Sequence, residues 1–200
     1  MAKNYLALGD SYTIGEAVAE HENFPHQLVK MLMNRQLTFN DPQIIARTGW
    51  TTGDLMDAIK QKEIKIHYDL VTLLIGVNNQ YRGMAIEEYE KDFEDLLELS
   101  IEFAGKQNGH VIVLSIPDWG FTPFAADRDR NKISGEIDSF NVVNKKIAKI
   151  YDVQYVDITP GSRLASSQHT LLASDGLHPS AIEYSRWANL LQPIVLGLFE

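Results

Sequence analysis

Short apolar runs alternate along the chain with longer segments in which apolar residues recur every three or four positions. The short runs are rich in Val, Ile and Leu and lack a strict alternation of polar and apolar residues, which is typical of strands buried on both faces. They cover Asn4–Leu8, Gln43–Arg47, Asp69–Ile75, His110–Ile116 and Gln154–Ile158. The pattern therefore predicts a strand in each of these runs.

Helical periodicity marks the segments between the predicted strands. In the segment Ile86–Lys106, Tyr89, Phe93 and Leu97 fall on one face and acidic residues on the other. The same pattern predicts helices over Phe24–Arg35, Thr52–Gln61, Ile86–Lys106, Ser134–Tyr151 and Ser180–Leu198. Repeated strand–helix units imply an α/β fold, in which helices cover both faces of a parallel sheet.

Two helix starts carry a capping-box pattern, in which a hydroxyl residue is followed three positions later by an acid. Thr51 and Asp54 predict the start of one helix, and Ser180 and Glu183 predict the start of the last one. The mixed run Asp-Arg-Asp-Arg at 127–130 is expected to be a solvated loop, because its charges cancel.

Polar residues and glycines follow the predicted strands. A parallel sheet of this kind places its functional site at the carboxyl ends of its strands. The segments found there are Gly9–Ser11, Arg47–Trp50, Gly76–Asn79, Pro117–Gly120 and, after the fifth strand, Ser174–Pro179. We therefore expect these segments, which are distant in sequence, to meet along one edge of the sheet.

A serine, a histidine and an aspartate from these segments form a candidate catalytic triad. Ser11 lies at a strand-to-helix turn, and a serine hydroxyl needs a nearby base to act as a nucleophile. Among the six histidines, His178 is the preferred base, because Asp175 precedes it by three residues and can bind one imidazole nitrogen. Taken alone, this spacing is more often turn and capping chemistry beside an exposed histidine.

Donors for a developing oxyanion are present at the same predicted edge. The candidates are the Ser11 amide, the Gly49 amide and the Asn78 side chain. Each has an ordinary alternative, since Gly49 can simply open a helix and Asn78 can be a turn residue. Asp10, just before the candidate nucleophile, is expected to stabilise the turn. The common location of nucleophile, base and donors favours an acyl-transfer site.

Four segments, in order along the whole chain, resemble the motif blocks of the SGNH hydrolases, also called GDSL-type esterases and lipases. They read ALGDSYTIG, ARTGWTTGDL, LLIGVNNQYRG and SDGLHPS. The resemblance implies that Ser11 is the nucleophile and that Asp175 and His178 complete the triad. It also implies that Gly49 and Asn78 complete the oxyanion hole with the Ser11 amide.

Two positions depart from the family pattern: Tyr12 stands where the family name implies leucine, and Asn79 stands where aspartate is frequent. The resemblance further implies a three-layer α/β/α sandwich with a five-stranded parallel sheet, flavodoxin-like in arrangement. A single domain over residues 1–200 is expected, with no metal and no organic cofactor. The implied reaction is hydrolysis of a carboxylic ester through an acyl-enzyme, and a transacylase would share this chemistry.

Aromatic residues near the predicted site are candidates for substrate binding. The tentative substrate-binding residues are Tyr12, Trp50, Asn79, Tyr81 and Trp119, with Phe121 and Phe124 nearby. Packing of loops onto the core is an equally good interpretation of these aromatic residues. The segment Pro117–Arg130 is long and mixed enough to be a mobile cover. Candidate substrates are short-chain acyl or acetyl esters of a carbohydrate, a lysophospholipid or a thioester.

Charge and composition narrow the alternatives. A net charge of −9 disfavours nucleic acid and anionic membranes as partners. No apolar stretch approaches the roughly 20 residues of a membrane helix, and no signal peptide is visible, so a cytoplasmic location is expected. The absence of cysteine excludes a thiolate nucleophile. The remaining rival is a non-catalytic flavodoxin-like module that binds a phosphate or flavin at DSYTIGE. The sequence favours no particular oligomeric state.

Overall fold

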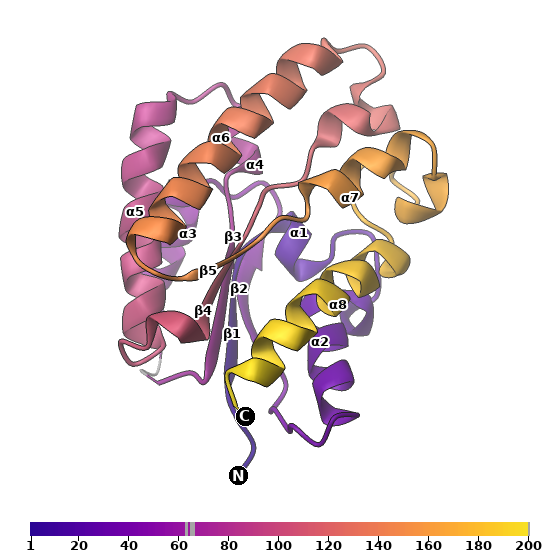
Figure 1. Cartoon of the computed structure of the whole chain (residues 1–200). Coiled ribbons are helices and arrows are strands. Elements are labelled where there is room, and N and C mark those ends of the chain that lie inside the picture. Colours follow the sequence, from indigo (N-terminus) through magenta and orange to yellow (C-terminus); the bar gives the residue numbers. More distant parts are fainter. Residues whose placement is uncertain (63, 65–66, 200) are drawn as a thin grey trace.

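The computed structural model describes residues 1–62, 64 and 67–199. In this part of the chain, the strands β1 (Tyr5–Asp10), β2 (Gln43–Arg47), β3 (Leu70–Leu74), β4 (Val111–Leu114) and β5 (Gln154–Val156) form one parallel sheet in the order β2-β1-β3-β4-β5 (Figure 1). The predicted strands are therefore confirmed. Four of them differ by one or two residues at their ends, where the apolar run continues beyond or stops short of the ladder.

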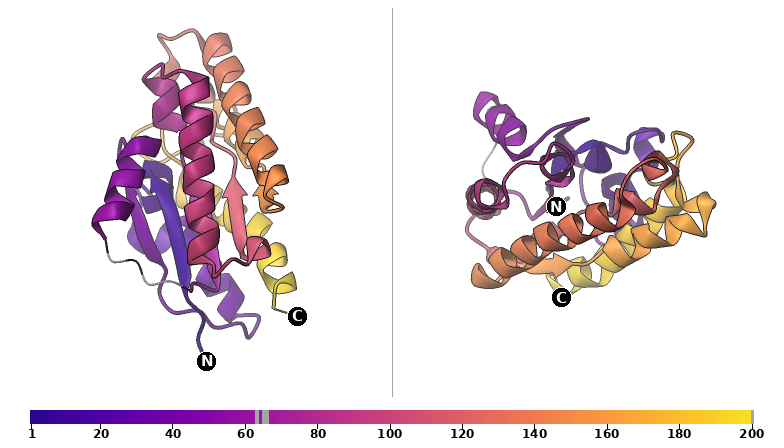
Figure 2. Two further views of the ribbon diagram at one scale, coloured as in Figure 1. Left: turned by 90° about the vertical axis from the view of Figure 1, so that its left-hand side faces the viewer. Right: turned by 90° about the horizontal axis from the view of Figure 1, so that it is seen from above.

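The helices are α1 (Ser11–Ile14), α2 (Phe24–Met33), α3 (Thr52–Gln61), α4 (Val77–Tyr81), α5 (Ile86–Phe103), α6 (Arg130–Ile150), α7 (Thr159–Arg163) and α8 (Ala181–Gly197). Helices α2 and α8 cover one face of the sheet, and α3, α5 and α6 cover the other (Figures 1 and 2). The three-layer arrangement is thus confirmed. None of the helices in the described residues has the length and apolar character needed to cross a membrane.

Three of these helices, α1, α4 and α7, were not predicted. Each has only four or five residues, which is too short to show a periodicity. They follow β1, β3 and β5, so all three lie at the carboxyl edge of the sheet, on the side away from both termini (Figure 1). The predicted site edge is therefore built largely from short elements.

Burial along the strands explains their apolar composition. Every residue of β1, β3 and β4 is buried, whereas the edge strands β2 and β5 are partly exposed. On the other side of the sheet from α5, the buried rings of Phe24 and Trp187 pack with centroids 6.0 Å apart and join α2 to α8. Each large apolar side chain buried in this way contributes about 1.5–3 kcal/mol.

The two predicted capping boxes have different outcomes. The box at α3 is confirmed, since the Thr51 amide donates to Asp54 Oδ2 at 2.9 Å and the Asp54 amide donates to Thr51 Oγ1 at 3.3 Å. The box at α8 is wrong. Ser180 Oγ donates instead to the Thr170 carbonyl at 2.7 Å, and the buried Glu183 carboxylate accepts from Trp187 Nε1 at 2.9 Å.

Helix α6 begins four residues before its predicted start. Asp129 Oδ1 accepts from the Lys132 amide at 3.0 Å, which makes Asp129 the N-cap and Arg130 the first helical residue. The run 127–130 is solvent-exposed as expected, and only its last residue, Arg130, belongs to a helix and not to a loop.

Candidate active site

Ser11, His178 and Asp175 form a continuous chain of hydrogen bonds. His178 Nε2 lies 3.0 Å from Ser11 Oγ, and His178 Nδ1 lies 2.6 Å from Asp175 Oδ2. Ser11 and His178 are only 4% and 6% exposed, so water has little access to the bond between them. The fold thus brings together residues that are 167 positions apart in the chain. A hydroxyl, an imidazole and a carboxylate in this order can generate a serine nucleophile.

Asp175 uses both of its carboxylate oxygens. Oδ2 binds the His178 ring, while Oδ1 accepts from the Leu177 and His178 amides, each at 3.0 Å. Partial burial by itself raises the pKa of Asp175, but the hydrogen bonds from the imidazole and the two amides outweigh burial and leave the pKa below its usual value. The carboxylate therefore stays charged and holds the imidazole ring in one orientation.

The turn that carries Ser11 is tightly packed. Asp10, at the end of β1, accepts a hydrogen bond from the Tyr12 amide at 3.0 Å and caps α1, in agreement with the expected structural role. Gly9 leaves no room for a side chain, because a Cβ atom there would lie 2.1 Å from Thr13 Oγ1 and 2.4 Å from the Leu74 carbonyl oxygen. Burial raises the pKa of Asp10 to about 7.

Gly49 and Asn78 line a cavity together with Ser11 and His178. Gly49 has a φ of +82°, a conformation that glycine adopts at little cost. No hydrogen bond among the described residues uses its amide. Asn78 Nδ2 donates one hydrogen to the Trp50 carbonyl at 3.0 Å, and its second hydrogen has no acceptor within the described part of the chain. Both groups can therefore donate to a ligand.

The cavity beside Ser11 has a volume of about 190 Å³. Its lining contains no charged side chain in the described residues and consists of Ser11, Tyr12, Thr48, Gly49, Val77, Asn78, Tyr81, Trp119, Phe124, Leu177 and His178. The sequence did not single out Thr48, Val77 or Leu177, although each is the chain neighbour of a predicted site residue. A larger hollow of about 890 Å³ between α3 and α5 contains none of the predicted site residues.

The tentative substrate-binding residues divide into two groups. Tyr12, Tyr81 and Trp119 line the cavity. Trp50 and Asn79 do not: the buried Asn79 side chain accepts from the Thr52 amide at 3.1 Å and donates to Thr52 Oγ1 at 2.7 Å, so it holds the start of α3. Asn79 and Tyr81 both belong to the short helix α4 but have different surroundings, which the sequence alone does not reveal.

Three aromatic rings form one wall of the cavity. The Trp119 ring centroid lies 5.4 Å from that of Tyr81 and 5.9 Å from that of Phe124. Trp119 Nε1 donates to Gln80 Oε1 at 2.7 Å, which fixes the indole ring. Phe121 is directed elsewhere, with the Arg163 guanidinium 5.9 Å from its ring centroid. The wall is therefore apolar and tied to α4 by a buried hydrogen bond.

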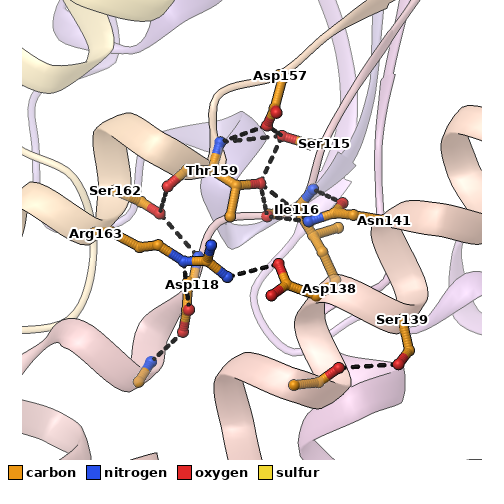
Figure 3. Close-up of polar contacts among 12 residues, drawn as sticks. Ser115, Ile116, Asp118, Asp138, Ser139, Asn141, Asp157, Thr159, Ser162 and Arg163 are labelled. Atoms are coloured by element: carbon orange, nitrogen blue, oxygen red, sulfur yellow. Dashed lines mark hydrogen bonds and ion pairs between the residues drawn. The ribbon is translucent and has the colours of Figure 1, made fainter. Parts of the chain in front are cut away.

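The first part of the predicted mobile cover is anchored to α6 and α7, as Figure 3 shows. The fully buried Asp118 carboxylate binds Arg163 Nε at 2.9 Å, and Arg163 Nη2 binds Asp138 at 2.6 Å. The Asp118 amide also donates to Ser162 Oγ at 2.9 Å. Leaving the buried Asp118 carboxylate without its partner would be strongly destabilising, and these contacts hold this end of the segment in place.

Comparison with known protein families and structures agrees with the sequence resemblance. The model of the GDSL-like lipase/acylhydrolase family matches residues 7–185. In a comparison with proteins of curated function, no match reached the significance level applied.

Several solved structures share the fold at low sequence identity. The crystal structure of TesA has a TM-score of 0.76 at 19% identity and covers 98% of this chain and 100% of its own. Axe2, an acetylxylan esterase from Geobacillus stearothermophilus, has a TM-score of 0.73 at 19% identity and covers 96% of this chain and 94% of its own. A lipase/acylhydrolase from Enterococcus faecalis has a TM-score of 0.72 at 20% identity and covers 98% of this chain and 96% of its own. At these identities the likeness establishes the fold alone.

Proposed function

Because this chain belongs to the GDSL-like lipase/acylhydrolase family and is a carboxylic ester hydrolase, we propose that it cleaves esters through an acyl-enzyme formed on Ser11. The observation that carries the proposal is the 3.0 Å contact between His178 Nε2 and Ser11 Oγ, with Asp175 2.6 Å behind the imidazole. This arrangement supports the roles of nucleophile, general base and orienting carboxylate.

In the proposed reaction, His178 Nε2 takes the proton of Ser11 as its oxygen attacks the ester carbonyl. The charged Asp175 stabilises the imidazolium that forms. The imidazolium then gives its proton to the leaving alcohol as the carbon–oxygen bond breaks. A water molecule, activated by the same imidazole, attacks the acyl-enzyme and releases the acid.

The Ser11 amide, the Gly49 amide and the Asn78 side chain are proposed to hold the oxyanion of each tetrahedral intermediate. The free hydrogen of the Asn78 amide supports this role, and its bond to the Trp50 carbonyl keeps the group oriented without reorganisation. Loss of one such donor lowers kcat by about 10²–10³, or about 3–4 kcal/mol. Asn78→Ala should therefore fall in this range.

The proposed substrate is a neutral ester with a short acyl group. The small cavity of about 190 Å³ and its uncharged, largely apolar lining support this choice. An acetyl group is a natural candidate, since one structural neighbour is an acetylxylan esterase. A longer acyl chain, as in a lysophospholipid or a long-chain thioester, would have to extend over the half-exposed rings of Tyr81 and Phe124.

Active-site labelling combined with a chain-length series tests the proposal. Wild-type protein should be labelled irreversibly by a fluorophosphonate and should hydrolyse p-nitrophenyl acetate and butyrate faster than the laurate. Ser11→Ala should lose the label and about 10⁶ of kcat. Acetylated xylan and lysophosphatidylcholine, assayed beside this series, separate a carbohydrate ester from a lipid. Wild-type turnover by Ser11→Ala would contradict the assignment of the nucleophile.

A non-catalytic flavin- or phosphate-binding module is not favoured, because the family match covers the blocks that such a module would leave without a common purpose. A transacylase remains chemically equivalent up to the acyl-enzyme. Adding an alcohol acceptor to the assay separates the two outcomes, since a transacylase would form the new ester in place of the free acid.

A further inference from the structure

Arg82, the residue after α4, contacts the backbone next to the proposed oxyanion donor. Its Nη2 donates to the Gly49 carbonyl oxygen at 2.5 Å, and its Nη1 lies 3.7 Å from Asp54 Oδ2 in the first turn of α3. The Arg82 side chain does not line the cavity described above. Its contacts are with the Gly49 carbonyl and the Asp54 carboxylate, so it acts on the segment that carries Gly49.

The peptide units that follow Gly49 are held from both sides. In the unit between Gly49 and Trp50, the carbonyl accepts a hydrogen bond from Arg82, and the N–H donates to the Arg47 carbonyl at 3.2 Å. In the next unit, the carbonyl accepts a hydrogen bond from Asn78 at 3.0 Å, and the N–H donates to Asp54 at 2.9 Å. Helix α4 and the residue after it thus clamp the loop that leads into α3.

Glycine needs such a clamp more than any other residue. Gly49 sits at a φ of +82°, and the lack of a Cβ leaves its two adjacent peptide planes free to rotate unless something holds them. The Gly49 N–H belongs to the peptide unit before Gly49, so a change in the Gly49 φ or ψ relative to the clamped unit would redirect this N–H relative to the cavity that Gly49 lines. A fixed donor requires no rearrangement as the oxyanion forms, which is the main source of its catalytic effect.

We propose that Arg82 is a positioning residue that keeps the Gly49 amide aimed at the oxyanion by holding the Gly49 carbonyl. This inference rests on the proposed function. The alternative is that Arg82 only stabilises the start of α3 through its ion pair with Asp54. Asp54→Asn separates the two, because asparagine keeps the acceptor oxygen for the Thr51 amide and loses the charge.

The experiment compares Arg82→Met, Arg82→Lys and Asp54→Asn with Arg35→Met, a control at an exposed arginine beyond the end of α2. For each, kcat and KM are measured with p-nitrophenyl acetate. Affinity is measured for n-butylboronic acid, which forms a tetrahedral adduct with a serine hydroxyl. We expect Arg82→Met to lower kcat and boronate affinity by a similar factor of about 10–100, with KM within twofold of wild type, because an oxyanion donor acts on the tetrahedral state.

Arg82→Lys should recover part of the loss in kcat and boronate affinity, since an ammonium group can still donate to the Gly49 carbonyl. If Arg82→Met does not fold, the comparison of Arg82→Lys with wild type tests the proposal. Asp54→Asn and Arg35→Met should match wild type. Unchanged boronate affinity in folded Arg82→Met, or an equal loss in Asp54→Asn, would overturn the positioning role. Neither result would affect the proposed function, which fails only if Ser11→Ala keeps wild-type turnover.

Discussion

Two carboxyl groups flank the Ser11–His178 pair, and their surroundings affect them in opposite ways. Asp10, on the nucleophile turn, is fully buried, and its Oδ2 has no hydrogen-bond partner among the described residues. Asp175, three residues before His178, has a side chain that is 33% exposed and accepts hydrogen bonds on both oxygens. Burial raises the pKa of Asp10 to about 7, whereas the hydrogen bonds to Asp175 lower its pKa.

The difference shows that depth of burial and hydrogen-bond supply together, and not proximity to the serine, decide which carboxyl group carries charge. Asp175 remains ionised and can balance an imidazolium. Asp10 is partly protonated near neutral pH, and it accepts a hydrogen bond from the Tyr12 amide, which stabilises the backbone of the turn. Opposite pKa shifts of neighbouring acids are a general way to assign separate roles to them.

The largest effect is expected from removing His178, which lies between Ser11 and Asp175. His178→Ala removes the imidazole that joins Asp175 to Ser11, so both the base and its charge partner are lost to the reaction. By analogy with other serine hydrolases, kcat should fall by about 10⁶. Turnover of p-nitrophenyl acetate by the folded variant, checked by circular dichroism, measures this. A loss of less than a hundredfold would show that another group serves as the base.

The second prediction compares the two acids directly. Asp175→Asn should lower kcat by about 10⁴, because an asparagine neither stabilises the imidazolium nor fixes the correct tautomer. Asp10→Asn should stay within about tenfold of wild type, since an amide oxygen can still accept from the Tyr12 amide. Both rates come from the same ester assay. Equal losses in the two variants would mean that Asp10 also takes part in the chemistry.

The third prediction concerns stability. Asp10 loses its proton near pH 4 in the unfolded chain and near pH 7 in the folded protein, so its contribution to stability is greatest below pH 4 and declines as the pH rises to 7. A shift of about 3 pH units corresponds to a decline of about 4 kcal/mol. Asp10→Asn should lack this decline in guanidinium unfolding measured from pH 4 to 8.

Asp41→Asn, at an exposed aspartate, is the matched control and should reproduce the wild-type pH dependence. If Asp10→Asn also followed the wild-type curve, the buried carboxyl group would have to be ionised in the folded protein throughout this range.

The smallest effect should come from Asp175 in acid. Its lowered pKa contributes stability that is present above the unfolded pKa near 4 and is lost as the pH falls through the folded value. Asp175→Asn should therefore flatten the acid limb of the stability curve, below the range in which Asp10→Asn acts. The same unfolding measurements from pH 2 to 5 test this. A steeper acid limb in Asp175→Asn would contradict the direction of the shift.

Much of this protein follows from local sequence. The runs that became β1, β3 and β4 are apolar because both of their faces are buried, and this signal needs no partner to be recognised. The motif blocks around Ser11 and His178 mark the site edge because carboxyl ends of parallel strands converge. Thr51 and Asp54 likewise form their capping box within one turn.

Other features depended on contacts between distant segments. The sequence around Ser180 is suited to a capping box, but the Ser180 hydroxyl donates to the Thr170 carbonyl instead. The anchoring of Asp118 by Arg163 and the hold of Arg82 on Gly49 join residues 45 and 33 positions apart. A local pattern determines which backbone conformation is favoured. Only the packed tertiary structure determines which of several possible partners lies within hydrogen-bond distance of a given side chain.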